Sequence, residues 1–391
     1  MQPRCALRCY TPMLLLALLI VGCARHDATF DLGKAPPALR SGVAAFGEGA
    51  YEQAITHLTQ ALTSDPHLAD AYVYRAQAYY RQGQYARAIT DYTQALTLAV
   101  PSGFVYMQRG LAYSREGDYD SAIADFSQAI ALAPNQPSLY MYRGLTYKQH
   151  RHDPDRAIAD FTQALTLDPQ IIEAYLERGL AYSQKRDTER AIADFTYVLS
   201  RNPNFVEVYV YRGDAYADQG DSILARTDYE QAIALRPTFA EAYSQRGEVY
   251  RRKGQYDRAL ADYNQALALN PNLADAYINR GAAYADRHDY ARAIADFNQA
   301  VAHDPTHARA YIHRGIAYLD IGDYDQAIPD FTQAITYEPT DALPYCNRAV
   351  AWYFKRNYDK SWEDVHRCKQ AGGTLNTRFL AVLGKASGRW E

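Results

Sequence analysis

The sequence has no excess of basic residues, no long apolar run, few cysteines and none of the short motifs that mark common catalytic sites. Its 41 Lys and Arg are outnumbered by 45 Asp and Glu, a formal charge of −4, which argues against non-specific nucleic-acid binding. A glycine-rich phosphate loop, a zinc-protease motif and a cysteine-pair metal motif are missing. We therefore expect no enzymatic activity, no cofactor, no catalytic residue and no metal ligand.

Three short segments look like parts of known sites but are better explained as turns. Gly220-Asp221-Ser222 looks like the start of a lipase-type block, but no His and Asp are placed to activate the serine. His303 and His307 have a helical metal-ligand spacing, yet the Asp-Pro pair between them predicts a turn. His150 and His152 fall in an irregular loop. An enzyme, or an accessory subunit of one, would need convergent titratable residues, and none occur outside repeating positions.

The longest apolar run, Met13 to Val21, is too short to span a bilayer comfortably and follows two arginines. It leads into Ile20-Val21-Gly22-Cys23, which resembles the lipobox of bacterial lipoproteins. The resemblance implies cleavage before Cys23 and lipid on its sulfur and amine. Residues 1–22 would then be a signal peptide, and residues 23–34 the lipidated cysteine with a short linker. An uncleaved anchor and an ordinary signal peptide are the alternatives.

The residue after the lipidated cysteine is Ala24 rather than Asp. In Gram-negative lipoproteins this pattern usually goes with transport to the outer membrane, so the resemblance implies a site in the bacterial cell envelope, facing the periplasm. Several acyl chains on one cysteine give stable anchoring, unlike a single chain.

Once a signal peptide and the lipidated cysteine are set aside, only Cys346 and Cys368 remain. They could pair in an oxidising periplasm. However, one lies on the first helix of the last repeat and the other late on the second, so we expect their Cα atoms to be too far apart. The expectation is two free, buried thiols.

Almost all of the remaining sequence repeats every 34 residues. In the unit 240–273, Tyr243, Gly247 and Tyr250 are spaced i, i+4, i+7, which is one face of a helix. A glycine break, a second helix with the same spacing of apolar residues and a closing proline follow. Fixed-period self-similarity of this length predicts a solenoid of helical hairpins, which presents a long surface rather than a catalytic cleft.

Seven positions of the unit match the tetratricopeptide repeat. One unit fills all seven with Tyr277, Gly281, Tyr284, Ala293, Phe297, Ala300 and Pro305. The chain resembles this family over residues 35–375, and the resemblance implies an all-α, right-handed superhelical solenoid of about ten hairpins. The ten units are 35–68, 69–102, 103–136, 137–171, 172–205, 206–239, 240–273, 274–307, 308–341 and 342–375. An amphipathic stripe within 376–391 predicts a C-terminal capping helix and tail.

Position 7 of the unit, usually Leu in the family, is Arg in nine units, and the same nine carry Asp in the second helix. The residues are Arg75, Arg109, Arg143, Arg178, Arg212, Arg246, Arg280, Arg314 and Arg348, with Asp91, Asp125, Asp160, Asp194, Asp228, Asp262, Asp296, Asp330 and Asp364. The first unit lacks both, having Ser41 and His57 instead. We interpret this as a ladder of buried ion pairs, because buried charges need partners. A ladder for an anionic ligand is the alternative.

The family resemblance implies that first helices line a concave groove, with positions 2, 5, 9 and 12 pointing into it. These positions are apolar towards the ends of the array and acidic in its middle. The candidate protein-binding residues are Met107, Met141, Glu207, Asp214, Asp218, Glu241, Ser244 and Glu248. Such a groove would take an extended or helical peptide with cationic residues. Alternatively, the acids favour helix N-termini and the apolar residues cover neighbouring helices.

These observations favour a membrane-anchored scaffold or adaptor lipoprotein that binds other proteins in the cell envelope. An accessory subunit of an envelope enzyme and a self-associating structural lipoprotein are the alternatives. Neither the partner nor the oligomeric state follows from the sequence.

Overall fold

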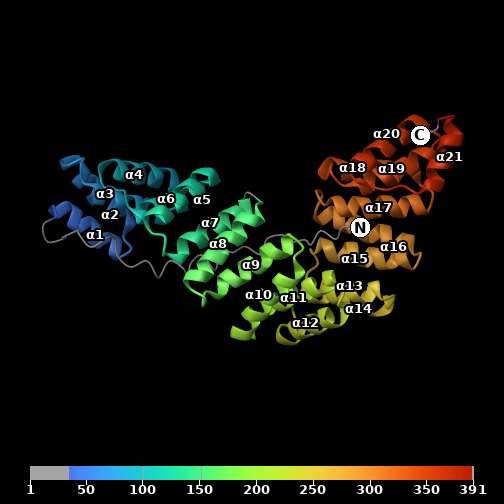
Figure 1. Ribbon diagram of the computed structural model, residues 1–391, viewed down its shortest axis with the longest axis horizontal. Helices are drawn as coiled ribbons and strands as arrows, with labels where there is room; N and C mark the ends of the chain where they lie inside the picture. Colours follow the sequence, from blue (N-terminus) through green and yellow to red (C-terminus); the bar gives the residue numbers. More distant parts are fainter. Residues whose placement is uncertain (1–34, 100, 151, 390–391) are drawn as a thin grey trace. The chain divides into compact units, whose positions relative to one another are not determined.

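A computed structural model describes residues 35–99, 101–150 and 152–389, and within them all regular secondary structure is α-helical. The expected signal peptide, Cys23 and the linker lie outside the described residues. In the described part 21 helices follow one another, and the first 20 form ten hairpins (Figure 1). The prediction of an all-α repeat solenoid is thus confirmed. The hairpins fall into two compact units, and the boundary in the sequence lies between Pro203 and Asn204. We call these units the N-terminal array and the C-terminal array.

In the N-terminal array each hairpin pairs an odd-numbered first helix with an even-numbered second helix. The first helices are α1 (Pro37–Gly47), α3 (Ala69–Arg81), α5 (Gly103–Glu116), α7 (Pro137–His150) and α9 (Ile172–Gln184). The second helices are α2 (Tyr51–Ser64), α4 (Tyr85–Leu98), α6 (Tyr119–Leu132), α8 (Pro154–Leu167) and α10 (Thr188–Arg201).

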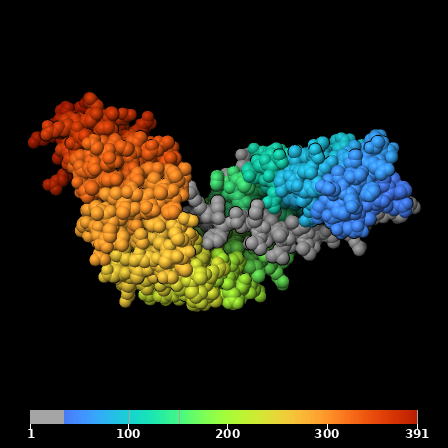
Figure 2. All heavy atoms as spheres, turned by 180° about the vertical axis from the view of Figure 1, so that it is seen from behind, coloured from blue at the N-terminus to red at the C-terminus, as the bar shows by residue number. Residues whose placement is uncertain are grey.

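The C-terminal array follows the same plan and adds one helix. Its first helices are α11 (Val206–Gln219), α13 (Ala240–Arg252), α15 (Ala274–Asp286), α17 (Ala308–Asp320) and α19 (Ala342–Phe354). Its second helices are α12 (Ser222–Leu235), α14 (Tyr256–Leu269), α16 (Tyr290–His303), α18 (Tyr324–Tyr337) and α20 (Tyr358–Gln370), and α21 (Thr377–Ser387) closes it. In a space-filling view these hairpins, yellow to red, stack without a gap (Figure 2).

The turn inside a hairpin is encoded by a residue with positive φ followed by a helix cap. Gly220 has φ +92°, and the Asp221 carboxylate then accepts hydrogen bonds from the amides of Ile223 and Leu224 at the start of α12. The glycine adopts the left-handed conformation at no steric cost, and the aspartate satisfies amides that the helix leaves open. Gly220-Asp221-Ser222 is therefore an ordinary inter-helix turn, as the sequence predicts.

The two helices of a hairpin cross closely because a small residue faces an aromatic ring. A Cβ atom added to Gly247 of α13 would lie 2.8 Å from Cε1 of Tyr263 on α14. Gly281 and Phe297 form the equivalent contact in the next hairpin, at 2.6 Å. The Tyr263 and Phe297 rings are almost fully buried, so each of these two hairpins packs one large ring against the backbone of a glycine.

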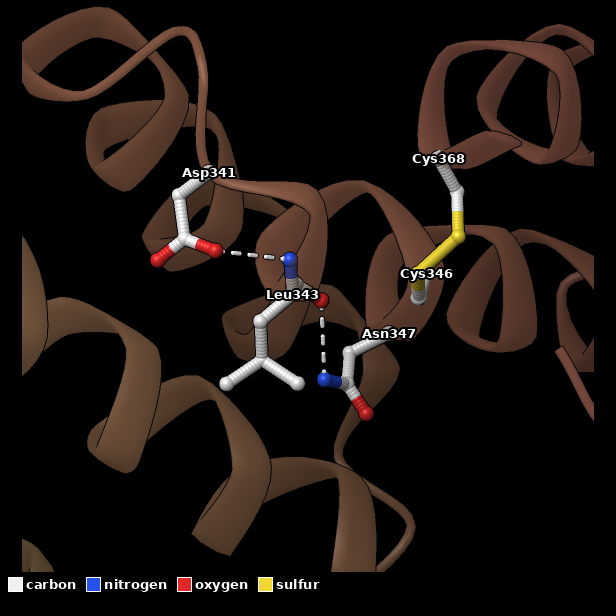
Figure 3. Close-up of a disulfide and its surroundings, with 5 residues drawn as sticks. All are labelled: Asp341, Leu343, Cys346, Asn347 and Cys368. Carbon is white, nitrogen blue, oxygen red and sulfur yellow. Dashed lines mark hydrogen bonds between the residues drawn. A yellow bond between two sulfur atoms is a disulfide. The ribbon is translucent and has the colours of Figure 1, made fainter. Parts of the chain in front are cut away.

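Cys346 and Cys368 form a disulfide, so the expectation of two free thiols is wrong. Their Cα atoms are only 5.2 Å apart, within the usual range for a bridge. The sulfurs meet because α19 and α20 run antiparallel at close range, which brings the first half of one helix beside the second half of the other (Figure 3). Asp341 starts α19 by accepting from the Leu343 amide, 3.0 Å away.

Candidate functional site

Within each array, first helices of successive hairpins approach one another closely. In the N-terminal array α1 contacts α3, α3 contacts α5, α5 contacts α7 and α7 contacts α9, and α11 to α19 follow the same rule in the C-terminal array. The first helices therefore line the inner side of each array. Side chains at positions 2, 6, 9 and 13 of these helices share one face and are half-buried or exposed in most units. We call this face the open stripe.

Position 5 does not belong to the open stripe. Met107 and Met141 are 2% and 1% exposed and pack in apolar clusters with Phe126 and Phe161. Ser244 is 4% exposed. The expectation that these three side chains face the groove is wrong, because position 5 is covered by the neighbouring first helix. The alternative interpretation, that apolar residues here cover adjacent helices, describes them correctly.

In the N-terminal array the centre of the open stripe is largely apolar. Position 9 carries Leu111, Leu145 and Leu180, all half-buried, on three consecutive first helices. Beside them, Lys148 of α7 donates a hydrogen bond to the Glu177 carboxylate of α9, and both residues are buried. The ion pair therefore joins two consecutive first helices, α7 and α9.

In the C-terminal array five acidic side chains lie on the open stripe of two consecutive helices. Glu207, Asp214 and Asp218 are on α11, and Glu241 and Glu248 are on α13. All five acidic candidates lie on the same face of two adjacent first helices.

Three of these acidic side chains accept hydrogen bonds from residues of the same array. Glu207 accepts from Nη1 of Arg236 at 2.6 Å, and Asp214 accepts from the Tyr229 hydroxyl at 2.7 Å. Glu248 is bound by Arg251 and Arg252, with N–O distances of 2.8 to 2.9 Å. Although burial raises the pKa of Glu248, these ion pairs outweigh it and lower the pKa to about 2. Glu248 is therefore charged, and the hydrogen bonds fix the orientation of all three side chains.

The network around Glu248 extends over three first helices. Arg251 of α13 also donates to Asp286 of α15 at 2.5 Å. Arg309 of α17 donates to the Asn279 side-chain oxygen of α15 at 2.6 Å, and Asn279 donates to the Ser244 hydroxyl of α13 at 3.4 Å. Polar contacts that link side chains from three repeats fix their relative register more than they add stability.

His313 of α17 lies at the edge of this network and stacks on Phe297, with ring centroids 5.7 Å apart. Burial, and then the positive charges of Arg309 and Arg251, lowers its pKa to about 3. The imidazole is therefore neutral over the physiological range. Sequence reasoning missed this residue, since position 6 of the unit varies in chemistry from repeat to repeat.

The Arg/Asp ladder is structural. In the described residues all nine pairs form, each with two hydrogen bonds of 2.6 to 2.9 Å from Nε and Nη2 to the two carboxylate oxygens. The aspartates are 3–7% exposed. In each pair both carboxylate oxygens accept from the arginine of the same hairpin. The ion pair therefore holds the two helices of that hairpin together. This confirms the predicted pairing.

A third donor of the ladder arginine connects neighbouring hairpins, which the sequence analysis did not predict. Nη1 of Arg314 bonds the Asn298 side-chain oxygen at 2.7 Å, and Nη1 of Arg109 bonds the Thr93 hydroxyl at 3.0 Å. In both cases the acceptor is on the second helix of the preceding hairpin. A Thr, Ser or Asn sixteen residues before eight of the nine arginines was the available signal, and Glu230 takes this place before Arg246.

The histidines with metal-like spacing do not converge on a metal. His303 ends α16 and stacks with Tyr277, whereas His307 precedes α17 and lies 3.2 Å from an Asp275 oxygen. Across the described ranges, no three His, Cys, Asp or Glu side chains gather as metal ligands would. Nor does any helix in the part of the chain that the structure describes have the length and apolarity to cross a membrane.

The fold and the open stripe define a helical-repeat solenoid built to present an elongated surface. Sequence models of the family agree: a model described as TPR repeat matches residues 110–150, 213–254 and 247–287. One described as tetratricopeptide repeat matches 148–204, 278–345 and 313–361, and another 45–90. The chain belongs to the tetratricopeptide repeat family. No curated protein sequence matches it.

Solved structures share the fold at low sequence identity. Yeast Tom70 is 13% identical over 90% of this chain and 88% of its own, with a TM-score of 0.56. The APC/C hetero-tetramer Cut9–Hcn1 is 15% identical over 89% of this chain and 96% of the other, with a TM-score of 0.50. A tetratricopeptide repeat protein from Parabacteroides merdae is 20% identical over 63% of this chain and 97% of its own, with a TM-score of 0.45. These likenesses show the fold alone.

Proposed function

We propose that the protein is a lipid-anchored scaffold of the bacterial cell envelope that binds other proteins along the open stripe. The carrying observation is the set of five acidic side chains on α11 and α13, which lie on the inner face of a tetratricopeptide array. Proteins of this family are typically non-catalytic and bind other proteins. Oriented, charged side chains on such a surface favour a partner of opposite charge.

The partner segment that fits the C-terminal array carries Lys or Arg, whose side chains would meet the acids of α11 and α13. In the N-terminal array, the row of Leu111, Leu145 and Leu180 would by itself take apolar side chains of a partner. An extended or helical segment suits either array, since each presents side chains at regular intervals.

The anchoring part of the proposal rests on the lipobox-like Ile20-Val21-Gly22-Cys23. We propose that lipid on Cys23 holds the array at the outer membrane, facing the periplasm. The disulfide between Cys346 and Cys368 supports an oxidising compartment, because such bonds persist there and not in the cytosol. Cys23→Ala should move the protein from the membrane to the soluble fraction, and a variant that stays membrane-bound would refute the anchor.

The binding part is tested by affinity capture from solubilised envelopes with a charge-reversed stripe. Asp218→Lys/Glu241→Lys should lose the partners that the wild type captures. Glu248 is left intact because it holds Arg251 and Arg252 in place. The matched control, Glu189→Lys/Glu363→Lys, makes the same charge change at exposed positions on second helices and should capture normally. Equal capture by all three proteins would remove the acidic surface from the proposal.

A further inference from the structure

The last hairpin lacks the aromatic ring that recurs at the helix crossing in the eight hairpins before it, and the first hairpin, which has Leu58 there, lacks it too. In the preceding hairpin the Phe331 ring of α18 covers Gly315 of α17, where an added Cβ would lie 2.8 Å from it. In the last hairpin the equivalent residues are Val365 and Ala349, so no aromatic ring fills the crossing. In the described residues, the single helix α21 follows α20 in place of a hairpin. Its two helices are instead joined covalently, between Cys346 and Cys368.

The segment that leads from α20 to α21 lies directly on this disulfide. A Cβ atom added to Gly373 would be 2.8 Å from the Cys368 sulfur, 2.9 Å from the Cys346 sulfur and 2.7 Å from Cβ of Ala342. A Cβ atom at these distances would overlap all three atoms, so only glycine fits against the bonded sulfurs at this position. The path of the segment is therefore set by the bonded sulfurs beneath it.

Helix α21 itself is held by few contacts. Leu383 is fully buried, and Phe379 lies edge-on to Tyr353 with centroids 5.7 Å apart. The Trp362 indole donates to the Ser387 hydroxyl at 3.0 Å. A polar hollow of about 400 Å³ is lined by the end of α21 and the turn before α20, and an exposed ion pair of 2.7 Å joins Arg389 to Asp359 beside it. Such a short helix with one fully buried apolar side chain is only marginally stable on its own.

We propose that the Cys346–Cys368 disulfide is a redox latch that seats the C-terminal capping helix α21. In the oxidised protein the bonded sulfurs leave room for Gly373, and α21 packs against α20. Reduction by a dithiol or a phosphine adds two electrons and two protons, breaks the S–S bond and leaves two thiols. Two thiols occupy more space than a bonded pair, so the segment at Gly373 is displaced and α21 is released.

Release of α21 uncovers one end of the array. Trp362 and Val365, which are 5% and 0% exposed beneath α21, would become accessible to solvent or to another protein. The array would be capped only in a compartment that allows disulfides. This inference does not depend on the lipid anchor or on the acidic stripe, so its failure would leave the proposed function standing.

Hydrogen exchange on the full chain tests the latch. In the oxidised protein the amides of 377–387 should be protected, and reduction with tris(2-carboxyethyl)phosphine should speed their exchange at least 10-fold. The amides of α17 and α18 should be unchanged, and re-oxidation should restore protection. Cys346→Ala/Cys368→Ala removes both sulfurs and with them the crowding at Gly373, so α21 should stay protected in this variant with and without the reductant.

A second variant calibrates the readout. Leu383→Asp should release α21 while the disulfide stays intact, which gives the exchange rate of a detached helix. Unchanged protection of α21 after complete reduction, verified by mass, would overturn the proposal. Loss of protection spreading through α17 and α18 would also overturn it, because the bond would then be a general staple and not a latch for the cap.

Discussion

The Arg246 guanidinium and the Asp262 carboxylate form two parallel hydrogen bonds, Nε to Oδ2 and Nη2 to Oδ1, each 2.8 Å long. The arginine also lies over Tyr243 and Tyr250, with its Cζ atom 5.6 and 6.0 Å from the ring centroids. One residue thus joins both helices of a hairpin and contacts two of the tyrosines that recur in most repeats. This arrangement explains the high tyrosine content without reference to a ligand.

Loss of this arginine should destabilise its hairpin. Arg246→Met leaves the buried Asp262 carboxylate without its partner, and we expect a loss of about 2–4 kcal/mol in local unfolding free energy. Hydrogen exchange of α13 and α14 measures the effect. Asp262→Leu in the same chain should recover most of the loss, since no unpaired charge remains, and Arg258→Met at an exposed position should cost little. Unchanged stability in Arg246→Met would refute the structural role of the ladder.

A methyl group at the helix crossing should also be costly. Gly247→Ala places a Cβ atom 2.8 Å from the Tyr263 ring, and overpacking of this kind costs about 1–3 kcal/mol. The same change at Gly47, where an added Cβ meets nothing within 4 Å, should be neutral or slightly stabilising. Thermal unfolding of the two variants distinguishes these outcomes, and equal midpoints would show that the ring moves aside freely.

Pro329 lies inside α18 and removes one backbone donor from that helix. Pro329→Ala should restore the hydrogen bond to the Asp325 carbonyl and stabilise the C-terminal array by about 1–3 kcal/mol. The equivalent residue of the preceding repeat is Ala295, in the middle of α16. Ala295→Pro should therefore produce a change of the opposite sign. A lower thermal midpoint in Pro329→Ala would mean that the proline ring contributes packing that alanine cannot replace.

Acidification should weaken the C-terminal array in two overlapping ranges. His313 has a folded pKa of about 3, below its usual 6.5, so it contributes stability that is complete above about pH 6.5 and is lost as pH falls towards 3. Glu248 has a folded pKa of about 2, below its usual 4.5, so its contribution is lost between about pH 4.5 and 2. Denaturant midpoints measured from pH 7 to pH 3 should fall accordingly.

Single substitutions show which residue causes the loss of stability in each pH range. His313→Gln should remove the decline that begins near pH 6.5, whereas His67→Gln, at an exposed position, should leave the profile unchanged. NMR titration of the His313 ring, which faces Arg309, Arg251, Glu248 and His307, should give a pKa near 3. A titration near 6.5 would contradict the buried, positively biased environment.

The period of the sequence was enough to predict the helical hairpins and the ladder. A residue that must sit on one face of a helix recurs at fixed spacing, and joint loss of Arg and Asp in the unit with Ser41 and His57 revealed their contact. Periodicity could not predict which side of a first helix stays open. Met107 and Met141 were expected in the groove, but each is covered by its neighbouring helix.

Contacts that occur once in the chain were harder to predict than contacts that repeat. The Cys346–Cys368 bond depends on the close antiparallel crossing of α19 and α20, a distance that helix spacing alone does not fix. The link from Arg251 to Asp286 and from Arg309 to Asn279 joins side chains of variable positions on different repeats. The repeating helical hairpins can thus be predicted from the sequence, whereas contacts between variable positions of different repeats cannot.

Site-specific photocrosslinking in living cells tests most directly that partners bind along the open stripe. A photoreactive amino acid is placed at Leu145, Asp218 or Glu241 on the stripe, or at Ile223 or Leu224 on α12, which are 63% and 43% exposed. All five positions are accessible enough to react with a bound protein. We predict that the stripe positions form adducts with a partner protein and that the two α12 positions do not. Adducts from α12 alone, or equal adducts from both faces, would contradict the account.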